Sequence, residues 1–290
     1  MGGYKENLNS IDKKIIVLAL EEDLGPAMQD VTSELLLGED TRRYKARIIS
    51  KEKNTIVLCG LAILETLLAS SSEEISFQTN FVDGQIIEPG ETILILEGPA
   101  KDLLIIERTL LNFLQHLSSI ATHTARFVKA VEGTVLKILD TRKTTPGLRH
   151  LEKYAVHCGG GVNHRVGLYD AIMIKDTHVD LIGGMQKTLS YFAKLPKQNV
   201  PVIVEVRNKE ELAIVLEYHR FISRILLDNM DIELLTACVK QCKGIISTEA
   251  SGGITLANIR AIAETGVDFA SIGQLTHSAV HVDLSMKCDI

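Results

Sequence analysis

Short apolar runs alternate with helix-length segments throughout the second half of the chain, from Thr134 onward. In order, the runs read VLKIL, AIMI, PVIV, RILL, GIIST and VDFASI. This alternation is typical of βα units that build a parallel sheet. Gly273 closes the last run, and a charged residue follows each of the first five, namely Asp140, Lys175, Glu205, Asp228 and Glu249. Barrel enzymes carry their chemistry at the carboxyl ends of strands, so the pattern predicts a (β/α) barrel of eight strands or fewer. An open doubly wound sheet is the alternative.

The first half of the chain mixes its elements irregularly and predicts an α+β layer. Apolar positions Ile11, Ile15, Leu18 and Ala19 suit one face of a helix. Strand-like runs follow, with turn residues between the later ones: RYKARIISKE, TIVLCG, ISFQTNFV and ETILILEG. A long helix is expected from about Leu103 to Val131, ending at Gly133. We therefore expect an N-terminal α+β sandwich domain over residues 1–115 and an α/β barrel domain with the active site over residues 116–290.

Composition narrows the functional classes. The 290 residues are 46% hydrophobic and 23% charged, which suits a folded chain with a sizeable core. The formal net charge of -6 argues against nucleic-acid binding, and no apolar run is long enough for a membrane span. Five cysteines occur without a C-x-x-C motif, and Cys238 and Cys242 have the spacing of a helix face. These features predict reduced thiols, a cytoplasmic protein and no zinc site.

The segment from Asp140 to His178 departs from this acidic background. It holds six Lys and Arg residues against four acids, together with four of the nine histidines. Arginine recognises carboxylate and phosphate in a planar, bidentate manner, and glycine lets backbone N–H groups approach an anion. The segment therefore predicts a pocket for a small ligand with several negative charges. A solvated surface loop is the alternative, but the charges directly follow two strand-like runs, which favours the pocket.

Two glycine-containing loops predict a phosphate site. Ser251-Gly252-Gly253 precedes the helix-like stretch TLANIRAIAE, and Gly273-Gln274 follows VDFASI. Barrels often bind phosphate with the loops after their last two strands, helped by a helix N-terminus. An ordinary glycine turn is the alternative for the first loop.

Several motifs, in order, resemble the quinolinate phosphoribosyltransferase family. They are EDLGPAMQDVTSELL, ERTLLNFLQHLSSIAT, DTRKTTPGLRHLEKYAV, IKD, VEVRN, LLDNM and EASGGITLANIRAIAETGVDFASIGQLTHS. The resemblance covers nearly the whole chain. It implies a homodimer or higher oligomer with shared active sites, whose subunits pair an α/β sandwich with an incomplete α/β barrel. It also implies Mg2+-dependent transfer of phosphoribose from phosphoribosyl pyrophosphate to quinolinate, with loss of CO2 and formation of nicotinate mononucleotide, a step of NAD biosynthesis.

The resemblance also assigns roles to individual residues. It implies that cations bind the two carboxylates of quinolinate, and that Arg108 reaches into the partner's site. It implies that Glu205 and Asp228 face the ribose and Mg2+, directly or through water. The residues implied in catalysis are Lys143, Lys175, Glu205 and Asp228. The full set of substrate-binding residues is Arg108, Thr141, Arg142, Lys143, His164, Arg165, Lys175, Glu205, Asp228, Ser251, Gly252, Gly253, Gly273, Gln274 and His277. A surface charge is the alternative for Arg108, and a structural hydrogen bond is the alternative for His164.

Three positions depart from the family pattern: Ser119 stands where Gly is common, Thr177 where Asn is usual, and Arg207 where a second acid is usual. Three rival functions remain open at this point. The first is a related phosphoribosyltransferase that acts on nicotinate or another base, although the set of cations favours a diacid. The second is a Schiff-base aldolase that uses Lys175. The third is an anion-binding protein without turnover.

Overall fold

The computed structural model describes residues 8–38, 40, 42–72 and 74–289, which form two compact units. The first unit comprises residues 1–125, 144–160 and 278–290, and the second comprises 126–143 and 161–277. A single boundary near residue 115 therefore does not describe this division, because two later segments pack with the first unit. Segment 278–290 joins it through a strand that pairs with the first sheet, and segment 144–160 joins it through the contact of His116 with Glu152.

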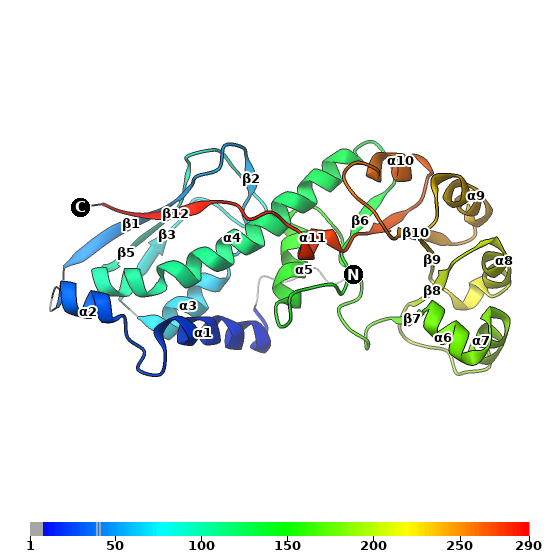
Figure 1. Ribbon diagram of the computed structural model, residues 1–290, viewed down its shortest axis with the longest axis horizontal. Helices are drawn as coiled ribbons and strands as arrows, with labels where there is room; N and C mark the ends of the chain where they lie inside the picture. Colours follow the sequence, from blue (N-terminus) through cyan, green and yellow to red (C-terminus); the bar gives the residue numbers. More distant parts are fainter. Residues whose placement is uncertain (1–7, 39, 41, 73, 290) are drawn as a thin grey trace. The chain divides into compact units, whose positions relative to one another are not determined.

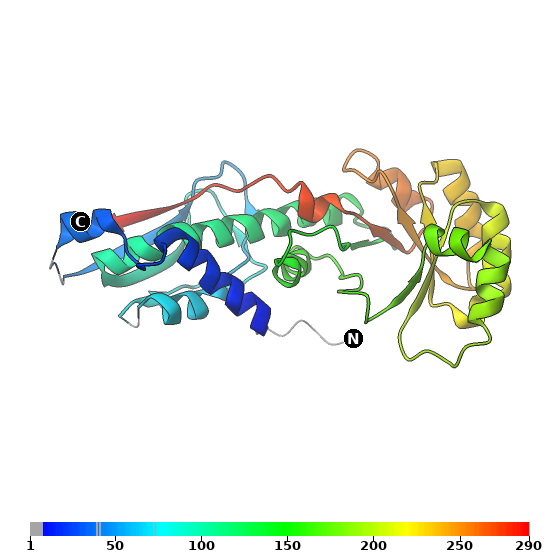
Figure 2. The same ribbon diagram turned by 60° about the horizontal axis from the view of Figure 1, so that its bottom comes forward.

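The first unit is built on a four-stranded antiparallel sheet with the strand order β12-β1-β5-β3. Its first elements are α1 (Ser10–Leu24), α2 (Val31–Leu37), β1 (Arg43–Ser50), β2 (Ile56–Val57), α3 (Ile63–Ser71) and β3 (Ser76–Gln78). The remaining ones are β4 (Ile86–Ile87), β5 (Thr92–Pro99), α4 (Ala100–Ala130), α5 (Arg149–Cys158) and β12 (Leu284–Asp289). Helix α4 runs beside the strands, as Figures 1 and 2 show. Residues 126–130 at its end belong to the second unit. The predicted α+β layer and long helix are confirmed.

Helix α1 begins where its sequence provides a cap. The side chain of Asn9 accepts hydrogen bonds from the backbone N–H groups of Ile11 and Asp12, and the Asp12 carboxylate accepts one from the Asn9 backbone N–H. The buried face differs from the predicted one, because Ile16 and Leu20 are buried whereas Ile11 is 60% exposed. The apolar residues of this helix lie on more than one of its faces, so their periodicity alone does not identify the buried face.

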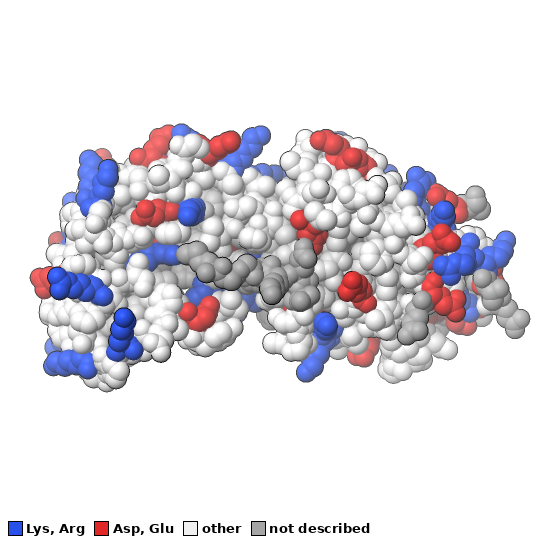
Figure 3. Space-filling model, turned by 180° about the vertical axis from the view of Figure 1, so that it is seen from behind, with Lys and Arg blue, Asp and Glu red and all other residues white. Residues whose placement is uncertain are grey.

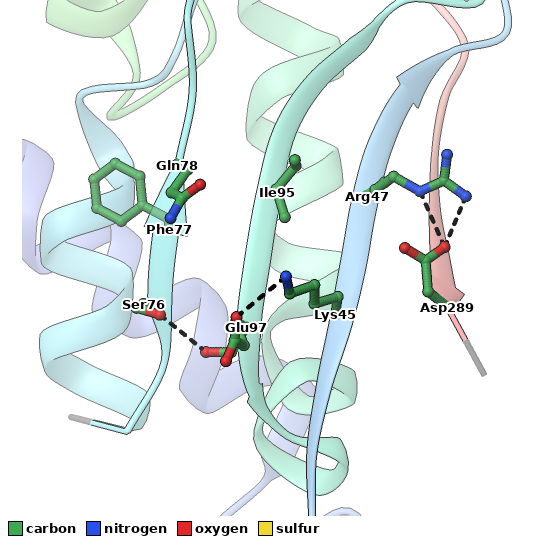
Figure 4. A pocket seen from close by; sticks show the side chains of 8 residues that line it. All are labelled: Lys45, Arg47, Ser76, Phe77, Gln78, Ile95, Glu97 and Asp289. Carbon is green, nitrogen blue, oxygen red and sulfur yellow. Dashed lines mark hydrogen bonds and ion pairs between the residues drawn. The ribbon is translucent and has the colours of Figure 1, made fainter.

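The two faces of the first sheet differ in character. Along β1, Ala46 and Ile48 are buried, while alternate residues, including Lys45 and Arg47, are exposed. The exposed face carries a shallow pocket, which Figure 4 shows with the ribbon of helices behind the strands. Its cations are paired with acids on neighbouring strands: Lys45 Nζ lies 3.8 Å from Glu97, and Arg47 lies 2.7 Å from Asp289. The positive charges of Lys45 and Arg47 in this pocket are therefore balanced by acids of the protein itself.

Ser119 connects helix α4 to the end of the chain. Its hydroxyl donates to the backbone oxygen of Gln115 and accepts from the backbone N–H of Val282, at 2.5 and 2.8 Å. The Gln115 side chain donates to the backbone oxygen of Leu284 at 3.2 Å. The hydroxyl that distinguishes Ser119 from glycine thus helps to fix the segment that leads into β12.

The second unit is a six-stranded parallel sheet with the order β6-β11-β10-β9-β8-β7. Its elements are β6 (Lys137–Leu139), β7 (Ile172–Ile174), α6 (Asp176–Ile182), α7 (Met185–Phe192), β8 (Val202–Val206), α8 (Lys209–Glu217), the short 3-10 helix His219–Phe221, β9 (Arg224–Asp228), α9 (Ile232–Cys242), β10 (Ser247–Ser251), α10 (Ile259–Glu264), β11 (Phe269–Ser271) and α11 (Gln274–His277). Helices α6 to α10 follow one another around the outside of the sheet (Figures 1 and 2). Among the described residues no pairing joins β6 to β7, so the predicted incomplete barrel is confirmed.

The register of the parallel strands gathers acidic residues on one face of the sheet. Glu205 and Glu249 both pair with Leu226, one from each side, so the three residues form a row across β8, β9 and β10. Asp228 and Ser251 pair in the next row, nearer the carboxyl edge. Because side chains alternate between faces along a strand, Glu205, Glu249 and Asp228 point to the same side. Glu249 lies within β10 rather than after it, so it is not an edge residue as its position after GIIST predicted.

Charges of both signs are interspersed over the face seen in Figure 3, in agreement with the modest net charge of -6.

All five cysteines are free thiols, and Cys238 and Cys242 are buried on α9, which agrees with their helical spacing in the sequence. In the part of the chain that the structure describes, no helix is both long and apolar enough to cross a membrane.

Candidate active site

Three cations lie at the carboxyl edge of the parallel sheet without an acidic partner. Arg142 and Lys143 follow β6, and Lys175 directly follows β7. All three are exposed, and none forms an ion pair with a residue that the structure describes. Because no salt bridge to a described residue holds these three side chains, they are available to an anionic ligand.

The backbone of Lys143 is anchored to the loop that follows β11. The Thr276 hydroxyl donates to the Lys143 carbonyl oxygen at 2.6 Å, and Thr141 Oγ1 accepts the Lys143 N–H at 3.0 Å. The side chain of Lys143 passes close to Gly273, where an added Cβ would lie 2.9 Å from Lys143 Cδ and 3.2 Å from His277 Nε2. The structure therefore brings together four of the predicted substrate-binding residues, and Gly273 provides the space for this approach.

Arg165 lies near Arg142. Its guanidinium donates to the carbonyl oxygen of Ala171 at 3.1 Å and lies 3.6 Å from the Met173 sulfur, beside β7. Burial lowers the pKa of Arg165, and the positive charge of Arg142 lowers it further, which outweighs the opposing effect of Asp170. Two arginines held this close favour an anion with more than one charge.

His164 lies on the same segment but faces the protein. Its side chain is only 6% exposed, and its Nε2 lies 3.3 Å from Oε1 of the buried Glu249. Its Nδ1 accepts the backbone N–H of Arg165 at 2.7 Å. This geometry matches the structural alternative for His164. Glu249 was predicted only as one of several strand-end charges, and no sequence signal linked it to His164.

Two acids, Glu205 and Asp228, are electrostatically coupled on the same face of the sheet. Burial raises the pKa of Glu205, and the negative charge of Asp228 raises it further, although the charge of Lys175 opposes this. The Asp228 carboxylate accepts a hydrogen bond from the side-chain amide of Asn229 at 2.6 Å. A cation between these acids would relieve their repulsion, so they fit a hard divalent ion such as Mg2+.

The donor set also suits the way Mg2+ binds. No group of three or more His, Cys, Asp or Glu side chains among the described residues is arranged as a metal cage. Mg2+ typically uses one or two carboxylates and completes its shell with water and substrate phosphate oxygens. Glu205 and Asp228 are therefore the residues that would hold it.

The two glycine loops predicted to bind phosphate are joined to one another. The Gln274 side chain donates to the carbonyl oxygen of Ile254, and the Asn229 backbone N–H donates to the Ser251 oxygen at 2.9 Å. The helix after the first loop starts only at Ile259 and is short, because Thr255 and Asn258 form a turn first. A turn therefore separates Gly253 from the first helical residue, and the first loop offers backbone and hydroxyl groups to a phosphate.

Two further positions singled out in the sequence are Arg108 and Arg207. Arg108 is exposed on α4 in the first unit, and no described side chain forms an ion pair with it. Arg207 is held on the surface by Asp180 and Glu211, at 3.0 and 2.6 Å. The ion pairs of Arg207 explain how a cation is accommodated where an acid is usual in the family.

An incomplete α/β barrel with charged residues at the carboxyl ends of its strands is typical of enzymes that act on small ligands. Residues 30–118 match the N-terminal domain of quinolinate phosphoribosyl transferase, and residues 120–287 match its C-terminal domain. The chain therefore belongs to the quinolinate phosphoribosyltransferase family.

Individual relatives agree with this membership. The chain is 39% identical to a probable nicotinate-nucleotide pyrophosphorylase [carboxylating] of Bacillus subtilis, with 94% of this chain and 92% of the relative covered. It is 38% identical to a mitochondrial quinolinate phosphoribosyltransferase [decarboxylating] of Nicotiana glauca, with 96% and 82% covered. The structure of the nicotinate-nucleotide pyrophosphorylase from Francisella tularensis superposes with a TM-score of 0.90 at 34% identity, with 99% and 100% covered.

Proposed function

We propose that this chain is a decarboxylating quinolinate phosphoribosyltransferase. It transfers phosphoribose from phosphoribosyl pyrophosphate to quinolinate and yields nicotinate mononucleotide, pyrophosphate and CO2. The observation that carries this proposal is a group of three cations that form no salt bridge with a described residue, in a chain whose two halves both match the family. These cations are Arg142, Lys143 and Lys175. These cations suit the pair of carboxylates on quinolinate better than the single carboxylate of nicotinate.

Arg142 and Arg165 bind the carboxylates in this proposal. Burial and the positive charge of Arg142 lower the pKa of Arg165, so the negative charge of a bound carboxylate would favour the charged form of Arg165. Lys143 and Lys175 add charge from the ends of β6 and β7, and Thr141 adds a hydroxyl. This part of the site fixes the pyridine nitrogen of quinolinate relative to the ribose.

The second substrate is bound mainly by the loops that follow β10 and β11. The Ser251-Gly252-Gly253 loop and the Gly273-Gln274 loop, with His277, bind its phosphate groups. Glu205 and Asp228 face the ribose hydroxyls and would hold Mg2+, directly or through water. When bound, this ion neutralises charge on the departing pyrophosphate.

The residues act by position and charge rather than through a covalent intermediate. As the bond from C1 to pyrophosphate weakens, positive character develops on the ribose, which Glu205 and Asp228 can stabilise. The pyridine nitrogen then bonds to C1 and becomes cationic. That charge stabilises the carbanion left when the adjacent carboxylate departs as CO2, and uptake of a proton from solvent at this carbon gives nicotinate mononucleotide. Lys143 and Lys175 keep the carboxylates aligned through both steps.

We also infer that the active enzyme is a homodimer that works in the cytoplasm. Arg108 lies in a different unit from the other cations and has no acidic partner among the described residues, so it is available to a second subunit's site. An isologous dimer would then contain two sites that each borrow one arginine. Five free thiols are in keeping with a reducing compartment.

A turnover assay tests the proposed function. The protein is incubated with quinolinate, phosphoribosyl pyrophosphate and Mg2+, and the release of CO2 and nicotinate mononucleotide is measured. We expect both products in equal amounts, no reaction after chelation of Mg2+, and little reaction when nicotinate replaces quinolinate. Equal turnover of nicotinate would instead support the related transferase. Binding of quinolinate without any product would support an anion-binding protein.

A further inference from the structure

A buried carboxylate in β10 joins two residues that are distant from it in the sequence. Glu249 is fully buried, and its Oε2 lies 2.8 Å from a guanidinium nitrogen of Arg224 on the adjacent strand β9. Its Oε1 lies 3.3 Å from Nε2 of His164. Arg224 is itself held over the ring of Phe269 on β11, with 3.9 Å between the guanidinium carbon and the ring centre. Strands β9 and β10 are neighbours in the parallel sheet (Figure 1), so this contact joins two adjacent strands.

The electrostatics of Glu249 favour its charged form. Burial alone would raise its pKa, but the contacts with His164 and Arg224 outweigh burial and hold the pKa below its usual value. A buried carboxylate with two partners has a defined orientation, because rotation would leave a charge unpaired. Glu249 therefore holds a fixed negative charge 3.3 Å from Nε2 of His164.

His164 transmits this fixed orientation to Arg165. Because Nδ1 of His164 accepts the backbone N–H of Arg165, the ring proton of the neutral form is on Nε2 and faces Glu249. The backbone of the same segment is also bound by Asp140, which accepts the N–H of His164 at 2.7 Å and the amide of Asn163 at 2.6 Å. The backbone of Arg165 is thus fixed through the ring of its neighbour.

We propose that Glu249 and Arg224 are positioning residues that set the place of Arg165 through the ring of His164. Arg224 orients Glu249, Glu249 fixes the tautomer and orientation of His164, and His164 holds the Arg165 backbone. In the proposed function, to which this inference adds, Arg165 binds a carboxylate of quinolinate. The chain of contacts therefore determines how well the site recognises the diacid, although neither Glu249 nor Arg224 touches it.

The network requires two acceptor atoms on residue 249. In Glu249→Gln the side chain keeps its shape, but an NH2 group replaces one carboxylate oxygen. This donor then faces another donor, either the Nε2–H of His164 or the guanidinium of Arg224. In Glu249→Gln combined with Arg224→Met, the amide oxygen is free to turn toward His164. The double variant should therefore recover part of what Glu249→Gln loses, which a general loss of stability would not produce.

The matched control is Thr248→Val. Thr248 is the neighbour of Glu249 on β10, is also buried, and its hydroxyl donates to Asp268 at 3.0 Å. Its side chain points to the other face of the sheet and does not contact the segment of His164 and Arg165. This variant removes a buried hydrogen bond from the same strand without altering the proposed contacts.

The test measures kcat, the KM of each substrate and thermal unfolding for the wild type and the four variants: Glu249→Gln, Arg224→Met, the double substitution and Thr248→Val. We expect Glu249→Gln to raise the KM of quinolinate about 10–100-fold, as loss of an outer-shell contact does elsewhere. The KM of phosphoribosyl pyrophosphate should stay within about twofold. The double variant should regain at least part of the loss, and Thr248→Val should lower the melting temperature while leaving the ratio of the two KM values unchanged. Equal changes in both KM values for Glu249→Gln, or no recovery in the double variant, would overturn the proposal.

A second measurement does not depend on turnover. The nitrogen-15 NMR spectrum of histidine-labelled wild-type protein reports which ring nitrogen of His164 carries the proton, with the signal assigned by its loss in His164→Asn. We expect the proton on Nε2 in the wild type and a shifted or exchanging signal in Glu249→Gln. A proton on Nδ1 in the wild type would exclude the proposed network even if quinolinate is turned over. Absence of turnover with the expected tautomer would instead exclude the proposed function.

Discussion

Gly252 lies so close to Asn229 that a Cβ atom on the glycine would come within 2.0 Å of Asn229 Oδ1. Gly252 also has a positive φ of 93°, and so does Asn229, at 52°. Since the Asn229 amide also binds Asp228, the close approach connects the first phosphate loop with one of the two acids of the site. The neighbouring Gly253 has a φ of 60° but has open space around it.

This contrast predicts different outcomes for two similar substitutions. Gly253→Ala should cost about 1 kcal/mol, because only the backbone conformation is unfavourable. Gly252→Ala should cost about 1–3 kcal/mol more, because Asn229 must also move. Denaturant unfolding measures both, and the KM of phosphoribosyl pyrophosphate should rise only in Gly252→Ala. Equal effects of the two substitutions would contradict the importance of the Asn229 contact.

Arg142→Ala and Arg165→Ala should weaken the binding of quinolinate far more than that of phosphoribosyl pyrophosphate. Removal of a charged hydrogen-bond partner in such a site costs about 2–5 kcal/mol. Calorimetric titration of each ligand measures the two effects separately. Arg260→Ala is the control for charge, because Arg260 pairs with Glu264 on α10 and lies outside the proposed site. Equal weakening of the binding of both ligands, with the fold intact, would contradict the assignment of Arg142 and Arg165 to quinolinate.

Glu205→Ala and Asp228→Ala should mainly impair the use of Mg2+ and phosphoribosyl pyrophosphate. Each variant leaves a single carboxylate where two are coupled, so a higher concentration of Mg2+ should be needed for half-maximal rate. Steady-state kinetics at varied Mg2+ measures this change, and the KM of quinolinate is the internal control. An unchanged Mg2+ dependence in both variants would show that these acids do not hold the ion.

Glu205 should make the stability of the protein depend on pH. A carboxyl group with a raised pKa stabilises the fold below its unfolded pKa of about 4.3, and this contribution is lost as the pH rises through the folded pKa. Glu205→Gln is neutral at every pH, so it should melt about 2–4 °C above the wild type at pH 8 and show a smaller difference at pH 4. Thermal unfolding between these pH values measures the trend, and Glu22→Gln, an exposed substitution on α1, is the control. A constant difference at all pH values would be inconsistent with the raised pKa.

Arg108 should act in the site of a second subunit. Mixing Arg108→Ala subunits with Arg142→Ala subunits should restore activity, because one of the two sites in the heterodimer retains both arginines. Homodimers of either variant should be nearly inactive. Differently tagged subunits allow the heterodimer to be isolated before the assay. A confirmed heterodimer without activity would place Arg108 in its own subunit's site or outside any site.

The sequence predicted the strand-end residues well because parallel strands share one direction. Once VLKIL, AIMI and RILL were recognised as strands, their carboxyl ends had to meet at one edge, which located Asp140, Lys175 and Asp228. Glu249 was misplaced because β10 extends past its apolar run to Ser251. The residue therefore lies inside the sheet, and alternation within a strand, rather than the end of a run, determines its environment.

The contacts that support these residues could not be predicted in the same way. Arg224 and Glu249 are paired through the register of β9 and β10, and His164 joins them from a loop that local sequence does not orient. The sequence also contained no sign that the last residues belong to the first unit, since the pairing of β12 with β1 joins residues near opposite ends of the chain. Even where periodicity identifies the buried face of an element, it does not report which element covers that face.

The position of β12 has a consequence for the synthesis of the protein. All residues of the second unit have been synthesised once His277 has been added, whereas the first sheet lacks its strand β12 until Leu284–Asp289 can pair with β1. At translation rates, roughly 10–40 s separate the synthesis of β5 from that of β12. During this interval one side of β1 has unpaired backbone groups, which are prone to association with other chains. The half of the molecule that leaves the ribosome first is thus the half that finishes folding last.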